Sequence, residues 1–253
     1  MVKLFLDPGH GGSDPGASNI IQESTYTLSY ALELGQKLGL LGFDVNYSRS
    51  TNSSVSLAQR GAMANSWGAD YFLSIHFNAG GNGSGHGIET YALTSGGQGE
   101  KLGKIVQNSL IDTTGTTNRG LKFANFQVLR DTNMPAILIE GGFVDNVSDA
   151  AKIPTDDYKH KYVIAVSKAL CAFTGIAWRD VYAPVVVTPP VAIQVVVPAP
   201  IVLAPVIISP VIIGKTIAVD DVWLTVRCRE HLVKQTIVDI EKLGFSAQRL
   251  ELA

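Results

Sequence analysis

Ionisable side chains follow three apolar segments of the sequence, each of which is predicted to be a buried strand. The first segment runs into Asp7 and His10, the second ends at His76 and the third ends at Glu140. Because open α/β sheets bind their ligands at the carboxyl ends of the strands, these side chains are expected to lie close together. Glu23 stands at the start of a predicted helix, where the helix dipole favours a negative charge.

Two imidazoles and one carboxylate form a donor set that suits zinc. His10, Glu23 and His76 would occupy three positions of a tetrahedral ion and leave the fourth for water. Zinc lowers the pKa of such a water to about 7 and polarises carbonyl groups, and Glu140 would then be free to act as a base. The pattern indicates a zinc hydrolase. The spacing alone leaves a second interpretation open, in which each histidine at a strand end is a structural residue.

Alternating strands and helices are expected to position these residues. Apolar runs and helical periodicity predict strands over Val2 to Leu6, Phe43 to Tyr47, Tyr71 to Ile75, Gly87 to Leu93 and Pro135 to Glu140, and helices over Glu23 to Leu41, Ser56 to Trp67, Gly99 to Ile111 and Tyr158 to Phe173. Repeated strand, helix and strand units predict an α/β fold, with a mostly parallel, twisted sheet covered by helices on both faces. The first helix is expected to turn five leucines to the core, namely Leu28, Leu32, Leu34, Leu38 and Leu41.

An apolar, proline-rich segment divides the chain. Residues 181 to 213 contain no charged side chain and hold 7 of the 11 prolines. The segment is long enough to span a bilayer, but its prolines would interrupt the hydrogen bonds of any helix. We therefore predict a body at residues 1–178, an extended linker at 179–214 and a small tail at 215–253.

The tail is predicted to be a small α+β module of βαβ type. Its pattern indicates a strand over Val222 to Arg227, a helix over His231 to Leu243 and a strand over Ala247 to Leu252. A unit of about 40 residues usually needs a metal, disulfides or association with another chain to fold. The tail is therefore a candidate for homo-oligomerisation or for docking on the body.

Charge and cysteine content exclude some partners. The net charge of -2, from 20 basic and 22 acidic residues, offers no basic field for nucleic acid or for an anionic membrane. Cys171 and Cys228 are too few for a disulfide framework or a cysteine zinc site, which agrees with a reducing cytosol. The N-terminus, Met1 to Pro8, lacks the pattern of a signal peptide.

Several motifs follow one another along essentially the whole body. They are Leu6-Asp7-Pro8-Gly9-His10-Gly11-Gly12-Ser13-Asp14-Pro15-Gly16-Ala17, Glu23, Ser56-Leu57-Ala58-Gln59-Arg60, Ala64-Asn65, Ala69-Asp70-Tyr71-Phe72-Leu73-Ser74-Ile75-His76-Phe77-Asn78-Ala79, Gly87-Ile88-Glu89, Arg119-Gly120-Leu121-Lys122, Val128-Leu129-Arg130 and Met134-Pro135-Ala136-Ile137-Leu138-Ile139-Glu140-Gly141-Gly142-Phe143-Val144-Asp145-Asn146. In their order and spacing, the chain resembles the zinc-dependent N-acetylmuramoyl-L-alanine amidases of the type 3 family, found in bacterial autolysins and phage endolysins.

The resemblance implies a zinc ion bound by His10, Glu23 and His76, with Glu140 as the catalytic carboxylate. The implied substrate is bacterial cell wall peptidoglycan, cleaved between the lactyl group of N-acetylmuramic acid and L-alanine. It also implies a wall-binding tail. Phe77 and Gly141 depart from the residues common in the family and lie next to the site, where they would affect its shape.

Further residues near the motifs have two interpretations each. Glu89 could orient a ligand histidine or lie at a strand surface, and Asn78 could face the site or cap a turn. Arg119 could bind a carboxylate of the stem peptide or be a solvated arginine in a loop. Asp7 and Asp14 are expected to fix the turn after the first strand.

The predicted function is zinc-dependent hydrolysis of peptidoglycan by a phage or prophage endolysin, made in the host cytoplasm and acting on the wall after release. One alternative is a bacterial autolysin with the same activity. A second is a zinc endopeptidase that cuts within the stem peptide. A third is a wall-binding protein without catalysis, which the complete set of His10, Glu23, His76 and Glu140 disfavours.

Overall fold

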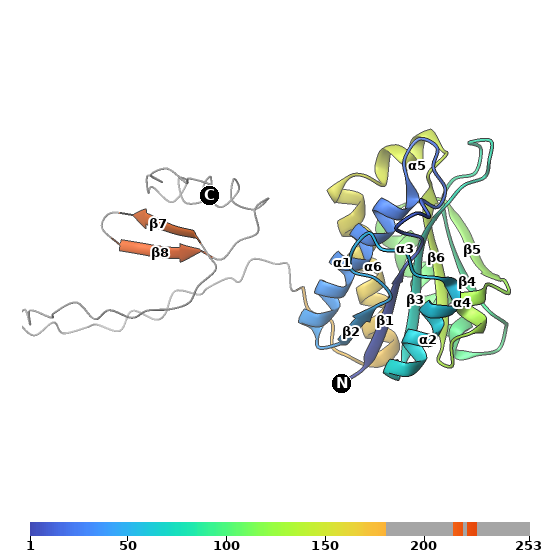
Figure 1. Cartoon of the computed structure of the whole chain (residues 1–253), viewed down its shortest axis with the longest axis horizontal. Coiled ribbons are helices and arrows are strands. Elements are labelled where there is room, and N and C mark those ends of the chain that lie inside the picture. Colours follow the sequence, from blue (N-terminus) through green and yellow to red (C-terminus); the bar gives the residue numbers. More distant parts are fainter. Residues whose placement is uncertain (181–214, 220–221, 227–253) are drawn as a thin grey trace, which may run out of the picture. The chain divides into compact units, whose positions relative to one another are not determined.

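The computed structural model describes residues 1–180, 215–219 and 222–226. Residues 1–180 form a six-stranded sheet with the strand order β2-β1-β3-β6-β4-β5 (Figure 1). The strands are β1 (Lys3–Pro8), β2 (Asp44–Tyr47), β3 (Tyr71–Asn78), β4 (Ile88–Ala92), β5 (Asn118–Phe123) and β6 (Ala136–Phe143). All neighbours are parallel except β4 and β6, which run antiparallel. The predicted α/β fold with a mostly parallel sheet is confirmed.

Helices cover both faces of this sheet. They are α1 (Glu23–Leu41), α2 (Leu57–Trp67), α3 (Gln98–Thr114), α4 (Gln127–Arg130), α5 (Val147–Lys152) and α6 (Asp156–Thr174). Strand side chains alternate between two cores, since Leu4 and Leu6 pack with α1, α3 and α6, whereas Phe5 packs with α2 and α4. Burial of both faces explains why the strands read as nearly continuous apolar runs.

Local sequence signals determine where the helices begin and end. Helix α2 begins with a capping box, in which Ser56 accepts from the Gln59 amide and the Gln59 side chain accepts from the Ser56 amide. Helix α1 ends at Gly42, which has the left-handed conformation typical of a helix terminus. The bounds predicted for α1 agree with the structure.

The leucine stripe predicted for α1 is only partly correct. Leu34, Leu38 and Leu41 are buried, but Leu28 is half-buried and Leu32 is exposed. The buried positions between the leucines belong instead to Thr27, Tyr30 and Ala31 and to other residues that a simple leucine pattern overlooks.

Three short elements were not predicted: β5, α4 and α5. Strand β5 lies at the edge of the sheet and has the sequence Asn-Arg-Gly-Leu-Lys-Phe, which is exposed or half-buried throughout. Such a polar edge strand lacks the apolar run on which the prediction depended. Helices α4 and α5 have only four and six residues, too few for a helical periodicity to be recognised.

A second compact unit, Thr188–Ala253, contains an antiparallel hairpin of β7 (Lys215–Val219) and β8 (Val222–Val226). Strand β8 was predicted, whereas β7 was not, because its five residues resemble the apolar runs of the preceding segment. The predicted linker core, helix His231 to Leu243 and strand Ala247 to Leu252 lie outside the described residues. None of the described helices has the length and apolarity needed to cross a bilayer.

Candidate metal centre

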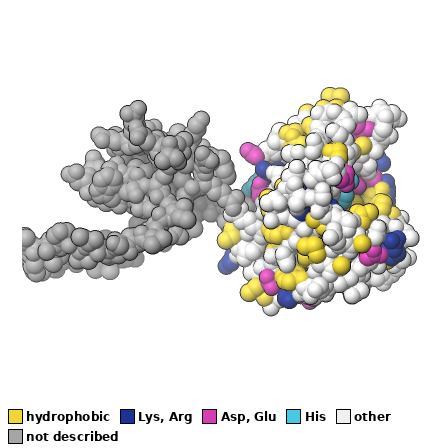
Figure 2. Space-filling model, viewed as in Figure 1, with side chains coloured by type: hydrophobic (Ala, Val, Ile, Leu, Met, Phe, Trp, Pro, Cys, Tyr) yellow, Lys and Arg dark blue, Asp and Glu magenta, His cyan; other side chains and the backbone are white. Residues whose placement is uncertain are grey.

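Three parallel strands bring the predicted site residues to one edge of the sheet. Pro8 at the end of β1 lies opposite Ile75 of β3, so His10 follows β1 at the level where His76 lies in β3. His76 in turn lies opposite Glu140 of β6. Figure 2 shows a face of residues 1–180 on which hydrophobic side chains form separate patches and histidines lie next to acidic side chains.

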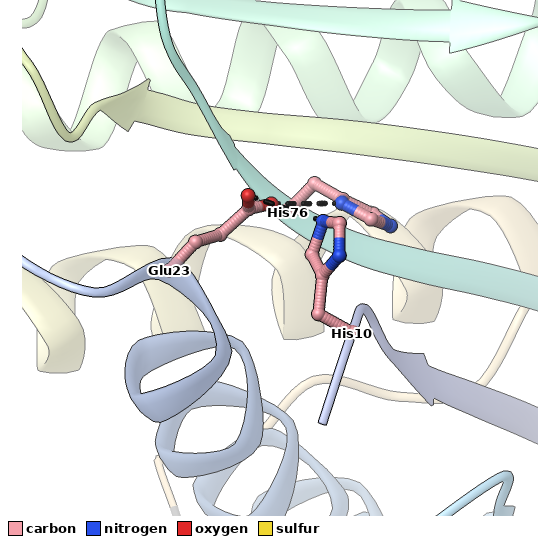
Figure 3. Close-up of side chains that lie close together, drawn as sticks. All are labelled: His10, Glu23 and His76. Carbon is pink, nitrogen blue, oxygen red and sulfur yellow. Dashed lines mark hydrogen bonds and ion pairs between the residues drawn. The ribbon is translucent and has the colours of Figure 1, made fainter. Parts of the chain in front are cut away.

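His10, Glu23 and His76 form a compact cluster of possible metal ligands. One ligand atom from each residue lies within 4.8 Å of the others. Glu23 lies between the two imidazoles: its Oε1 is 2.8 Å from His76 Nδ1, and its Oε2 is 3.1 Å from His10 Nε2 (Figure 3). The three side chains thus come from the loop after β1, the first residue of α1 and strand β3.

Backbone amides also bind the Glu23 carboxylate. Oε2 accepts from the Ala17 amide at 2.9 Å, and Oε1 accepts from the Phe77 amide at 3.1 Å. The Phe77 amide is available because the register between β3 and β6 shifts between His76 and Asn78. Glu23 is therefore fixed from both sides, with only 4% of its surface exposed.

The charges of the cluster depend on one another. Burial alone would raise the pKa of Glu23, but hydrogen bonds and charge interactions with His10 and His76 lower it well below the ordinary value. Burial alone would lower the pKa of His10, but the carboxylates of Glu23 and Asp14 raise it above the ordinary value. The site thus stabilises positive charge next to Glu23, as a cation site requires.

The turn after β1 allows His10 to reach Glu23. His10 has a φ of 60°, a left-handed conformation that few residues other than glycine adopt. Gly9 and Gly16 give the imidazoles space: a Cβ atom on Gly9 would lie 2.2 Å from the His76 ring, and one on Gly16 would lie 2.6 Å from Glu23 Oε2. The glycines of this motif are therefore required by the close approach of the ligands.

Asp14 contacts His10 directly. Its Oδ2 lies 2.8 Å from His10 Nδ1, and its Oδ1 accepts from the Gly16 amide at 3.0 Å. Asp14 therefore fixes the turn, as expected, and also orients the imidazole so that Nε2 faces Glu23. The prediction named only the first role, although a spacing of four residues from His10 is compatible with such a pair.

Arg60 stabilises the same turn through its hydrogen bonds. The buried guanidinium donates to Asp7 Oδ1 at 2.7 Å, to the Pro8 carbonyl at 2.7 Å and to the His10 carbonyl at 2.8 Å. Asp7 is fully buried, and it also accepts hydrogen bonds from the hydroxyl groups of Ser48 and Ser74. Arg60 belongs to one of the motifs of the resemblance, but nothing in its sequence position connects it to His10.

Arg49 joins the His10 turn to the start of α1. It is buried, and its Nη2 donates to the Gly9 carbonyl at 2.8 Å and to the Ser24 carbonyl at 3.1 Å. Because Ser24 follows Glu23, one guanidinium connects two of the three ligand segments. No motif pointed to Arg49, since its role depends on a contact between distant segments.

Glu140 lies beside the cluster of His10, Glu23 and His76, and one of its carboxylate oxygens has no hydrogen-bond partner among the described residues. This oxygen, Oε2, is buried. Burial raises the pKa of Glu140 well above the ordinary value, and the negative charges of Glu23 and Glu89 raise it further. A divalent cation in the cluster would oppose this shift. A buried oxygen without a partner next to possible ligands is typical of a group that receives a proton or contacts a ligand.

Glu89 has neither of the two roles predicted for it. It is buried and has no hydrogen bond to a histidine within the described residues; instead Oε2 accepts from Arg119 Nε and from Lys122 Nζ, both at 2.6 Å. Oε1 accepts from Tyr91 Oη at 2.7 Å and from Asn78 Nδ2 at 2.8 Å. The prediction of an exposed strand residue was wrong because the side chains of Arg119 and Lys122, on the neighbouring strand β5, lie against Glu89.

Arg119 and Asn78 are also placed by the structure. Arg119 belongs to β5 and not to a loop, so the predicted loop placement was wrong. The residue is exposed, as a solvated arginine would be, but it also forms an ion pair with Glu89. The Asn78 side chain donates to Glu89 Oε1 through Nδ2, and its Oδ1 accepts from the Ala79 amide at the end of β3.

The donor chemistry fits a divalent transition metal. Two imidazole nitrogens and a carboxylate oxygen converge, and the second nitrogen of His10 faces Asp14, an arrangement common around bound zinc. A mostly parallel sheet with such a cluster at its carboxyl edge defines an α/β protein with a candidate metal centre.

Residues 4–172 match the family described as N-acetylmuramoyl-L-alanine amidase, and the chain belongs to this family. It is similar to the amidase CwlM of Bacillus licheniformis, with 48% identity over 162 residues that cover 62% of this chain and 63% of the relative. The sporulation-specific N-acetylmuramoyl-L-alanine amidase of Bacillus subtilis strain 168 is 46% identical over 162 residues, 62% of each chain. This chain thus spans slightly less than two thirds of the length of both relatives.

The fold agrees with that of a solved amidase. The crystal structure of N-acetylmuramoyl-L-alanine amidase from Clostridium difficile 630 has a TM-score of 0.67 and 33% sequence identity, and the match covers 69% of this chain and 97% of the solved one. The resemblance stated from the sequence motifs is therefore confirmed.

Proposed function

We propose that this protein hydrolyses the amide bond between N-acetylmuramic acid and L-alanine in peptidoglycan, with zinc bound by His10, Glu23 and His76. The observation that carries the proposal is the cluster of these three side chains beside the unpartnered Oε2 of Glu140. Membership of the amidase family supports the choice of bond and substrate.

Zinc held by His10, Glu23 and His76 would supply a Lewis acid that lowers the pKa of a bound water and polarises a carbonyl. Glu140 would accept the water proton on its carboxylate and give it to the departing amine of L-alanine. Its Oε2 is free for this task within the described residues, whereas both oxygens of Glu23 are occupied by His10, His76 and two backbone amides. The two glutamates therefore have different roles.

Product analysis tests the reaction. The full chain is incubated with a soluble muramyl-peptide, and the new amine is identified by mass spectrometry. An amidase releases the amine of L-alanine, whereas an endopeptidase releases the amine of an inner residue. The second product would replace the amidase by the alternative of cleavage within the stem peptide, and the absence of any product would favour a wall-binding protein.

Metal analysis tests the ligands independently of turnover. We expect about one zinc ion per chain, and we expect His10→Ala and His76→Ala each to lose it. His86→Ala is a matched control, because His86 is exposed and its one hydrogen bond within the described residues is to the Ser84 carbonyl. Circular dichroism excludes unfolding, since loss of a metal can also reduce stability. Full zinc content in both ligand variants would remove these residues from the metal site.

The biological role has two candidates with the same chemistry. The sequence predicts a phage or prophage endolysin that is made in the host cytoplasm and reaches the wall after release. The bacterial autolysin role is supported by the relatives, which come from Bacillus species and one of which is named sporulation-specific. Transcript levels after prophage induction and during sporulation distinguish the roles, because an endolysin gene should respond to the first condition alone.

The tail is proposed to bind the cell wall and to associate with a second tail. Of its residues, the structure describes the hairpin of β7 and β8. Sedimentation of the full chain and of residues 1–180 measures the association: a larger species that is present only in the full chain supports self-pairing, and two monomers contradict it.

A further inference from the structure

Two cationic side chains lie around Glu89, next to the candidate catalytic carboxylate. Glu89 of β4 lies opposite Glu140 of β6 in an antiparallel pair, so the two side chains are on the same face of the sheet. Arg119 and Lys122 extend from the neighbouring strand β5 to Glu89 Oε2, each at 2.6 Å. His76, Glu140, Glu89 and the two cations thus form a row across four strands, β3, β6, β4 and β5.

The cationic pair has more positive charge than Glu89 can neutralise. One carboxylate faces two cations, which leaves an excess of one positive charge. Burial would raise the pKa of Glu89, but the hydrogen bonds from Lys122, Tyr91 and Arg119 lower it, so Glu89 stays ionised and fully hydrogen-bonded. Both oxygens of Glu89 are therefore held by hydrogen-bond donors, two of which are cationic.

Arg119 and Lys122 keep donors that face away from Glu89. In the described part of the chain, Arg119 uses only Nε in a hydrogen bond, so both Nη groups are available, and Lys122 uses one of its three N–H groups. Their side chains are 33% and 38% exposed. A guanidinium edge and an ammonium group with free donors favour a carboxylate ligand.

The orientation of both cations is fixed. The Arg119 guanidinium lies 4.8 Å from the centroid of the Phe143 ring, and Lys122 Nζ lies 5.9 Å from that of the Tyr91 ring. Phe143 is buried, which gives the guanidinium a rigid support. A binding group that is already oriented loses little entropy when its ligand arrives.

The spacing fits a short peptide. Neighbouring strands are about 4.8 Å apart, so the cations lie roughly 5 to 10 Å from the level of Glu140. An extended peptide covers about 3.3–3.6 Å per residue, so this distance corresponds to roughly one to three residues beyond the cleaved amide.

We propose that Arg119 and Lys122 form a binding site for a carboxylate of the stem peptide, within the first residues after the bond that is cleaved. The proposal rests on the proposed amidase function. It makes both residues determinants of substrate specificity, with Glu89 as the positioning residue that orients them.

Two soluble muramyl-peptides that differ in one group test this site. In one, the residue after L-alanine carries a free carboxylate, and in the other a carboxamide. The zinc-loaded full chain is expected to prefer the carboxylate by about 10- to 100-fold in kcat/KM, mainly through KM, because a charge-assisted hydrogen bond is lost with the amide. Arg119→Met and Lys122→Met should each reduce kcat/KM for the carboxylate peptide about tenfold more than kcat/KM for the carboxamide peptide.

Lys161→Met is the matched control. In the part of the chain that the structure describes, Lys161 is an exposed lysine that pairs with Asp157, one turn away on α6. Its loss removes the same charge without touching the row. It should leave both substrates unchanged. If Arg119→Met does not fold, Arg119→Lys replaces it, because a lysine keeps a cation beside Glu89. This variant should retain only part of the preference for the carboxylate peptide, because a lysine keeps the charge but cannot reproduce the planar fork of arginine.

Two outcomes overturn the proposal. The first is a wild-type chain that does not distinguish the two peptides. The second is an equal loss on both peptides in the folded variants, which would mean that the network supports Glu140 and does not bind substrate. Binding of the two peptides to Glu140→Gln, measured by calorimetry, decides the question even if the wild type cleaves neither. In that case a preference for the carboxylate supports the site while the proposed function fails.

Discussion

Glu23 illustrates how one residue depends on many others at this site. Its carboxylate is within hydrogen-bond distance of both imidazoles and of two backbone amides, and it is almost fully buried. Glu140 differs from Glu23 because one of its carboxylate oxygens has no hydrogen-bond partner in the described residues. Two glutamates of the same type thus differ in their surroundings, and these surroundings predict their roles.

Exchange of each glutamate for glutamine separates the two roles. Glu140→Gln should keep its zinc and lose about 10²- to 10⁴-fold in kcat, because an amide of the same shape cannot accept the proton of water. Glu23→Gln should lose zinc first. Zinc per chain and kcat on a soluble muramyl-peptide check both expectations. Normal turnover in Glu140→Gln would contradict the mechanism, and loss of zinc in this variant would make Glu140 a ligand.

The pH dependence of stability tests the Glu89 network. The pKa of Glu89 is lowered in the folded chain, so the unfolded chain binds more protons near the ordinary value of about 4.3. The stabilisation is therefore complete above that pH and is lost as the pH falls through the lower pKa of the folded state. Glu89→Gln should reduce the free energy of unfolding by about 1–3 kcal/mol at pH 7. Urea unfolding from pH 7 to pH 3 should show this difference shrinking, and a constant difference would contradict the ion pairs.

At the scale of elements, the sequence predicted the buried elements and missed the exposed ones. Strands β1, β3 and β6 carry apolar runs that are buried on both faces, so their pattern is strong. Strand β5 is an exposed edge strand, and without it Glu89 could not be recognised as buried. His10, Glu23, His76 and Glu140 could be named because they follow apolar runs or begin a helix in the sequence, although β3 and β6 continue past His76 and Glu140 to Asn78 and Phe143. Arg49 and Arg60 could not be named in this way. Their contacts join segments that are about 40 to 50 residues apart in the chain.

The loop after β1 can be tested through its glycines. Gly9→Ala should displace the His76 ring and weaken zinc binding by tenfold or more, because the new Cβ atom would lie 2.2 Å from that ring. Gly39→Ala is the matched control: no atom lies within 4 Å of its Cβ position, and in the interior of α1 the exchange should stabilise the chain by about 0.5–1 kcal/mol. Competition with a zinc chelator and thermal unfolding measure the two effects. Unchanged zinc affinity in Gly9→Ala would contradict the close packing of this loop.

At the scale of the whole molecule, the candidate metal centre and the family match lie in the first compact unit, Met1–Val187. The family match ends at residue 172, and the site residues all precede it. The contacts of the unit continue further, since the Arg179 guanidinium donates to the Leu40 carbonyl at 2.7 Å and Lys37 Nζ lies 3.3 Å from Asp180. Trp178 also lies close to Lys37, with the Nζ atom 5.0 Å from the ring centroid. A functional fragment therefore has to include residues up to Asp180.

Truncation after Asp180 is expected to keep turnover and to lose part of the wall binding. Residues 1–180 contain His10, Glu23 and His76 and the complete six-stranded sheet. The value of kcat/KM on a soluble muramyl-peptide should therefore stay within about twofold of that of the full chain. Truncation after residue 172 should lower the melting temperature, because it removes Trp178 and Asp180 from the fully buried Lys37. Co-sedimentation with purified walls compares the binding of the full chain and of residues 1–180. Equal binding by the two chains would remove wall recognition from the tail, and an inactive fragment 1–180 with a normal melting temperature would show that the tail contributes to turnover.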